Sequence, residues 1–163
     1  MAIELLTKSD TVTNITAKPP VYLEPSEHSG RMRYAESRTT TTGTTTTSTS
    51  TYLVMRLPSN AVLKYGSIQG VGSVDLPDLD MGVRQLASPN TLVDGAFATA
   101  LDIDDTGDHV FIGQLGSQDT NQKLWEWAGL TSDPGGEFDL HASLDADAVA
   151  AGVFVTKVYY VID

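Results

Sequence analysis

Alternating apolar and polar positions predict short β-strands along most of the chain after residue 33. The most unusual stretch is the polar run 39–51, which contains ten Thr, two Ser and one Gly. The apolar segment 52–57 follows directly, and a Pro-Ser-Asn turn then leads into the apolar segment 61–65. Two interpretations of the polar run compete: a low-complexity linker, or the exposed half of a long β-strand.

The strand interpretation fits better, because the alternation continues without a break into Leu53, Met55 and Leu57. Thr is β-branched and suits a pleated surface. We therefore predict one strand over 44–57 that forms a hairpin with 61–65. A Thr-rich exposed half would also be an edge that a neighbouring copy can use, and its candidate residues are Thr45, Thr47, Thr49 and Thr51.

Four further strands are predicted, over 34–42, 95–103, 109–113 and 137–144. The second and third of these form a hairpin around an Asp-rich turn. In the last, alternation places Phe138, Leu140 and Ala142 on one side. It places Asp139, His141 and Ser143 on the other. The final segment 153–162 is apolar on both faces, which predicts a central strand. The segment 75–80, with three Asp and one Pro, is predicted to be a loop.

One segment has helical spacing: Leu124, Trp127 and Ala128 share a face. We expect a helix of about ten residues, capped by Ser117 or Asp119. Altogether the pattern predicts an all-β fold, a jelly-roll-like sandwich of about eight antiparallel strands with one short helix, over 34–163. Residues 1–33 hold several Pro and few large apolar groups, so we expect an extended N-terminal arm.

The charge is distributed unevenly. Residues 1–38 are neutral, 39–70 carry +2, and 71–163 carry three basic and sixteen acidic groups. Such an acidic body repels nucleic acid and anionic membranes, so neither is an expected partner. This charge distribution favours the simplest interpretation, an acidic surface that keeps the protein soluble. Two alternatives are a protein that works in high salt, and an arm and a body that bind different partners.

Catalytic and metal-binding motifs are not found. There is no Cys, and the three His residues share no motif. Part of an EF-hand calcium loop is suggested by Asp102, Asp104 and Asp108. Positions 5 and 12 of such a loop are Thr106 and Gly113 here, and neither residue supplies the carboxylate that the loop requires. The segment is therefore only a weak candidate for a cation site. We expect neither an enzyme nor a cofactor. Trp125 and Trp127 favour a plug at the end of the sandwich, with a sugar-stacking platform as the alternative.

The segments "YLVMRLPSNAVLKYGSIQ", "DMGV", "LVDGAFATALDI" and "DLHASLDADAVAAGVFVTKVYYVID" together resemble jelly-roll head decoration (cement) proteins of tailed viruses of bacteria or haloarchaea. The resemblance covers roughly 45–163. It implies a structural virion protein, made in the host cytoplasm, that binds the major capsid protein on the outer capsid surface, usually as a homotrimer. Alternatives are a host-glycan-binding module of a head fibre, turret or tail, and a neck or tail component.

A Pro-stiffened arm can lie across neighbouring capsid subunits and bury a large area there. The arm's apolar, Pro and Arg side chains are the predicted contacts with the capsid. They are Ile3, Leu5, Leu6, Val12, Ile15, Pro19, Pro20, Tyr22, Arg31 and Arg33.

Overall fold

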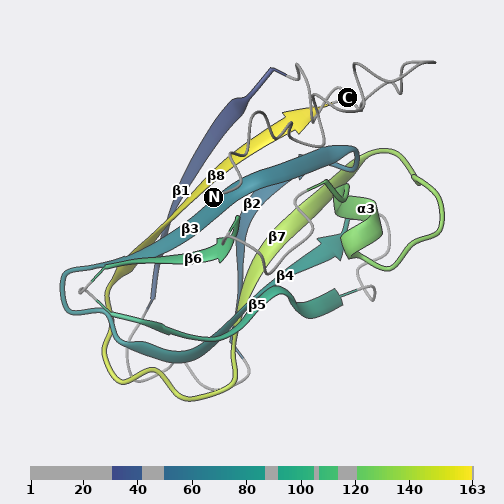
Figure 1. The fold of residues 1–163 in the computed structure, drawn as a ribbon. Helices are drawn as coiled ribbons and strands as arrows, with labels where there is room; N and C mark the ends of the chain where they lie inside the picture. The colour runs from purple at the N-terminus through teal and green to yellow at the C-terminus, as the bar shows by residue number, and fades with distance from the viewer. Residues whose placement is uncertain (1–30, 42–49, 87–91, 105–106, 114–120, 163) are drawn as a thin grey trace, which may run out of the picture.

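The computed structural model describes residues 31–41, 50–86, 92–104, 107–113 and 121–162. Two four-stranded sheets face each other (Figure 1), with strand orders β1-β8-β3-β6 and β2-β7-β4-β5. The strands are β1 (Arg33–Thr40), β2 (Thr51–Pro58), β3 (Ala61–Val71), β4 (Leu76–Gln85), β5 (Leu92–Ile103), β6 (Asp108–Ile112), β7 (Glu137–Leu144) and β8 (Val153–Ile162). All pairings are antiparallel.

This strand order is that of an eight-stranded jelly roll, in which the chain crosses between the layers at almost every connection. Among the strands in the described ranges, β4 and β5 are the only pair consecutive in sequence that hydrogen-bond to each other. The predicted all-β sandwich is confirmed, as is the central position of β8, which pairs with β1 on one side and β3 on the other.

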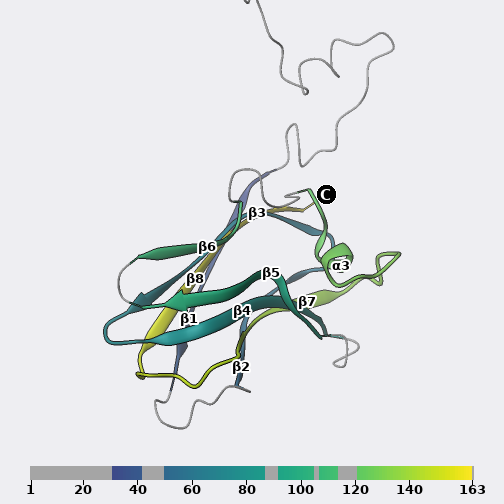
Figure 2. The same ribbon diagram turned by 60° about the horizontal axis from the view of Figure 1, so that its bottom comes forward.

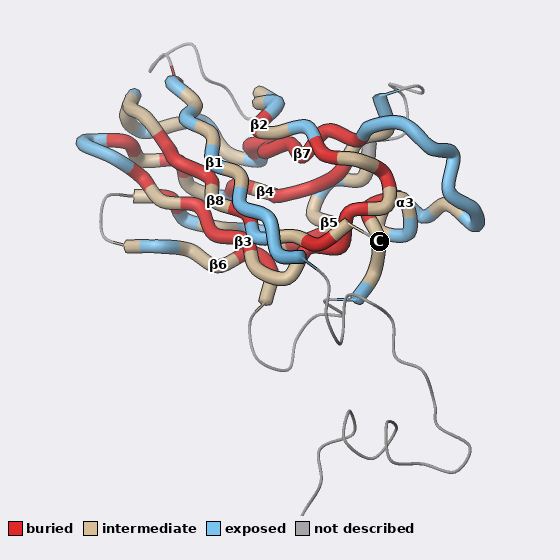
Figure 3. Tube along the Cα trace, turned by 90° about the horizontal axis from the view of Figure 1, so that it is seen from above, coloured by how far each residue is buried: buried red, intermediate tan, exposed pale blue. Residues whose placement is uncertain are grey.

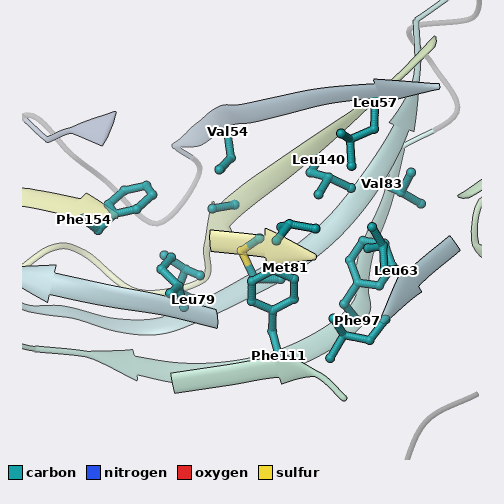
Figure 4. Close-up of a cluster of buried hydrophobic side chains, with 14 of the residues drawn as sticks. Val54, Leu57, Leu63, Leu79, Met81, Val83, Phe97, Phe111, Leu140 and Phe154 are labelled. Atoms are coloured by element: carbon teal, nitrogen blue, oxygen red, sulfur yellow. The ribbon is translucent and has the colours of Figure 1, made fainter. Parts of the chain in front are cut away.

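The core lies between the two sheets, where buried positions of both layers meet (Figure 3). Phe97 and Phe111 come from opposite sheets, and their ring centroids lie 6.3 Å apart. Figure 4 shows these rings with Leu63, Met81 and Leu140 in the interior. On β7 every second side chain from Phe138 enters this core, as the alternation predicts.

The two predicted hairpins are wrong. The strand β2 pairs with β7 in one sheet, whereas β3 pairs with β8 and β6 in the other. The turn between them carries the chain across the sandwich, so that Leu57 and Ala61 enter the core from opposite layers. Ser59 holds this turn, because its N–H donates to Gly136 O and its carbonyl accepts from Trp125 N. The segments 95–103 and 109–113 likewise belong to different sheets.

Two other local predictions are corrected. The expected loop 75–80 is mostly strand, because β4 begins at Leu76 and its register shifts place Leu76, Leu79 and Met81 in the core. The helix α3 (Leu124–Trp127) has four residues rather than about ten. The proposed caps lie outside the described residues, and the Glu126 carboxylate accepts the Lys123 N–H at 2.7 Å. The helix closes one end of the sandwich (Figure 2).

Candidate functional site

The outer face of the β2-β7-β4-β5 sheet carries a row of buried polar side chains. On β7 they are Asp139, His141 and Ser143, which alternate with core residues and therefore point away from the core. The predicted alternation is confirmed, but these side chains are almost as buried as the core itself. Buried polar groups require partners, and those partners come from β2, β4 and β5.

One half of the row is a carboxylate held between two arginines. Arg56 Nε lies 2.8 Å from Asp139 Oδ1, and Arg84 Nη2 lies 3.2 Å from Asp139 Oδ2. Only 3% of the Asp139 side chain is exposed. Burial alone would raise the pKa of Asp139, but hydrogen bonds and charges from both arginines outweigh burial and hold the pKa below its ordinary value. This group ties together three adjacent strands.

The other half of the row centres on Asp94 in β5. Its Oδ1 lies 2.6 Å from His141 Nε2 and 2.6 Å from Ser143 Oγ. A carboxylate only accepts hydrogen bonds, so Nε2 carries the proton of a neutral His141. The His141 Nδ1 atom finds no partner among the described residues. Burial lowers the pKa of His141, against the opposing effect of Asp94.

Gly82 makes the hydrogen bond between His141 and Asp94 possible. It sits on β4, between β7 and β5, and its register partner is His141. A Cβ atom at Gly82 would lie 2.7 Å from His141 Nε2 and 2.2 Å from Val93 O. The absence of a side chain therefore leaves the space in which the imidazole reaches over β4 to Asp94.

A serine, a histidine and an aspartate in contact raise the question of nucleophilic catalysis. In a catalytic triad the serine hydroxyl donates to the histidine, which in turn is oriented by the carboxylate. Here the Ser143 hydroxyl donates to Asp94 instead, and the His141 side chain is fully buried. The group has no activated nucleophile, so the arrangement stabilises the sheet rather than catalysing a reaction.

The tryptophans pack against the core at the end of the sandwich. Trp125 and Trp127 are partly buried, and the Trp127 ring centroid lies 5.2 Å from that of Phe97. This is the geometry expected of a plug. The Nε1 atoms of both rings are buried and have no hydrogen-bond partner among the described residues.

The Asp residues of the weak cation candidate face different neighbours. Asp104 Oδ1 lies 3.8 Å from His109 Nε2, whereas Asp108 Oδ1 lies 3.8 Å from Lys157 Nζ. Within the described ranges, no group of three or more His, Asp or Glu side chains is placed to hold a metal ion. In the same part of the chain, no helix has the length and apolar character that crossing a bilayer requires.

Most residues predicted to contact the capsid or a neighbouring copy lie outside the described ranges. The arm residues before Arg31 lie outside the described residues, as do Thr45, Thr47 and Thr49. Arg31 and Arg33 are exposed at the beginning of β1, and Thr51 is exposed at the beginning of β2. Both β1 and β2 are edge strands of their sheets.

No protein-family model matches the chain, and no curated protein matches it. Among solved structures, a chain of the cyanophage Pam1 capsid asymmetric unit is similar, with a TM-score of 0.48 and 17% sequence identity. The match covers 82% of this chain and 86% of that one. A likeness of this size does not define a function.

Proposed function

We propose that the chain is a structural protein of a virion, and specifically a decoration (cement) protein on the outer surface of a tailed-virus head. The observation that carries the proposal is the jelly-roll strand order around an apolar core. Because side chains fill the interior, a partner would bind on the outer surface of the protein. The resemblance to decoration proteins implies this fold, and the strand order agrees with that expectation.

Jelly rolls occur as capsid domains, lectin domains and cupins. A cupin binds its metal inside the barrel, where this chain places phenylalanine and aliphatic side chains. The described residues hold no metal-binding cluster. The two remaining classes act through their surfaces, and the choice of a capsid role rests on resemblance, because a fold alone does not determine function.

The edge strands are the proposed contacts between copies. A strand at the edge of a sheet presents unpaired backbone groups that another chain can extend. The exposed Thr51 begins β2, directly after the Thr-rich run. We propose that this edge joins copies in a homotrimer.

The N-terminal residues 1–30, with Arg31 and Arg33 where the described chain begins, are the proposed capsid contact. Several copies on one particle, each bridging neighbouring capsid subunits, would stabilise the lattice through multivalency.

The proposal is tested with virus particles that lack this chain. Purified full-length chain and a variant without residues 1–30 are incubated with the particles, which are then sedimented. We expect the full chain to sediment with the heads and the truncated variant to remain in solution. The melting temperature of the truncated variant is measured alongside, and an unchanged value shows that the body still folds.

Equal binding by the truncated variant would refute the role of residues 1–30. Absence of any binding by the full chain would refute the decoration role. Immunogold labelling at the neck or tail, rather than over the head, would assign the chain to one of those positions instead.

A further inference from the structure

Three tyrosines lie side by side on the outer face of the β1-β8-β3-β6 sheet. Tyr34 and Tyr159 are register partners, as are Tyr65 and Tyr159. The ring centroid of Tyr159 lies 5.0 Å from that of Tyr34 and 6.0 Å from that of Tyr65. Tyr34 is 49% exposed and Tyr159 is 38% exposed. We call Tyr34, Tyr65 and Tyr159 the tyrosine row.

The row is held in place before any ligand arrives. Tyr159 is in ring contact on both sides, and the Tyr34 hydroxyl donates to the Glu36 carboxylate. That hydrogen bond raises the pKa of Tyr34 to about 12, because loss of the proton would break the bond. Rigid aromatic side chains lose little conformational entropy on binding, which favours recognition of a ligand.

Hydrogen-bonding groups lie next to the row on the same face. The positions that follow along the three strands bring exposed or half-buried charged and polar side chains to the surface beside the rings: Glu36, Arg38, Lys157 and Gln69. Arg38 lies four residues from Tyr34, or about 13 Å along the strand. Arg38 is exposed and, within the described residues, has no carboxylate partner.

Size and charge indicate which ligand this face suits. A tyrosine buries about 150–250 Å², so the exposed parts of Tyr34 and Tyr159 offer roughly 200 Å². A stable protein interface needs about 800 Å² from each partner. Arg31, Arg33 and Arg38 place three positive charges on β1 and just before it, against the single carboxylate of Glu36, in a chain whose net charge is −11. An anionic ligand is therefore favoured beside β1 over the acidic part of the chain, 71–163.

From this geometry we infer that the outer face of the β1-β8-β3 strands binds an oligosaccharide that carries carboxylate groups. The sugar rings stack on Tyr34 and Tyr159, and a carboxylate pairs with Arg38, whose planar guanidinium suits bidentate contact. This activity is separate from capsid binding, and it is measured without any virus particle.

The test uses purified full-length chain and isothermal titration calorimetry. Tetragalacturonate is the acidic probe and maltotetraose the neutral one. We expect saturable binding of tetragalacturonate, and at least tenfold weaker binding of maltotetraose. Tyr159→Ala should lower the affinity at least tenfold, whereas Tyr159→Phe should retain it, because the ring face carries the contact. Arg38→Gln should lower the affinity about tenfold and reduce its dependence on salt.

Thr40→Ala is the matched control, since Thr40 is exposed on the same strand and lacks a ring or a charge. It should bind like the wild type. Absence of binding by either probe would refute the inference, as would unchanged affinity in both Tyr159→Ala and Arg38→Gln. Equal affinity for maltotetraose would refute the acidic class of ligand. Self-association that Tyr159→Ala abolishes, without saccharide binding, would assign this face to contact between copies and overturn the inference.

Discussion

Gly82 is the position where a single methyl group should do the most damage to the polar row on the outer sheet face. In the variant Gly82→Ala, the new Cβ would lie 2.2 Å from Val93 O and 2.6 Å from His141 Cε1. Contacts this short are not tolerated, so β5 or the imidazole must move. Either movement separates His141 Nε2 from Asp94 Oδ1, which now lie 2.6 Å apart.

The cost has two parts. Overpacking in a closely packed region costs about 1–3 kcal/mol. Loss of a buried hydrogen bond to a charged group costs about 1.5–3 kcal/mol more. We therefore expect Gly82→Ala to lower the free energy of unfolding by about 2.5–6 kcal/mol, a large part of the ~5–15 kcal/mol typical of a domain.

Urea unfolding, followed by the fluorescence of Trp125 and Trp127, measures this cost, because both rings are partly buried against the core. With a slope of about 2 kcal/mol per M, the midpoint should fall by roughly 2 M. Gly107→Ala is the matched control, since a Cβ there meets nothing within 4 Å. It should change the stability by less than about 0.5 kcal/mol.

A loss of less than about 1 kcal/mol in Gly82→Ala would refute this account of the glycine. A double-mutant cycle with His141→Ala separates the two parts of the cost, because the clash with Val93 O remains when the imidazole is gone. Strict additivity of the two substitutions would show that Gly82 does not act through His141.

Three further predictions concern charged groups in or near this row. Asp139→Asn should destabilise the protein by about 3 kcal/mol in urea unfolding, because it removes the buried charge between two arginines. The lowered pKa of the Asp139 carboxyl stabilises the folded protein above about pH 4, and this stabilisation is lost in acid. Asp139→Asn lacks the carboxyl, so the variant should lose less stability on acidification. The lowered pKa of His141 means that the unfolded chain binds more protons below about pH 6.5, so stability should fall from pH 7 to pH 5. His141→Gln should flatten that decline, and an unchanged slope would contradict it. Burial and neighbouring carboxylates raise the pKa of Asp80, so Asp80→Asn should raise the melting temperature at pH 7, whereas a lower value would contradict the assignment.

The positions of most strands could be predicted from the sequence, but their partners could not. Hydrophobic patterns are local, so alternation marks β7 clearly and a long apolar run marks β8. Pairing in a jelly roll is not local: Arg33 at the beginning of β1 pairs with Tyr160 near the end of β8. A turn such as the one at Ser59 looks the same in sequence whether it joins paired strands or crosses the core.

The strand β4 was missed for a different reason. Its register against β5 shifts between Leu76 and Leu79 and again between Leu79 and Met81. These irregularities break the strict alternation, and Asp78 has a positive φ of 59°. The segment therefore has the composition of a loop although its apolar side chains are fully buried.

The hydrogen bonds of the buried polar row on β7 could not be predicted from the sequence either. Alternation placed Asp139, His141 and Ser143 on one face of a strand but predicted nothing about their burial. Asp94 is 47 residues from His141, and β4 lies between their strands. The cross-strand hydrogen bond depends on Gly82, whose role appears only when β4 is paired with β7.

The two outer faces of the sandwich have different capacities for partners. On the β2-β7-β4-β5 face, Asp139 and Asp94 are already engaged by side chains of their own sheet. A partner there would have to replace these hydrogen bonds, which costs free energy. On the opposite face, Tyr159 and Arg38 are exposed, and Arg38 is unpaired within the described residues. New contacts to Arg38 and to the exposed ring of Tyr159 replace water rather than hydrogen bonds of the sheet. Recognition of a ligand is therefore favoured on the face with the tyrosine row, while the polar row stabilises the sheet.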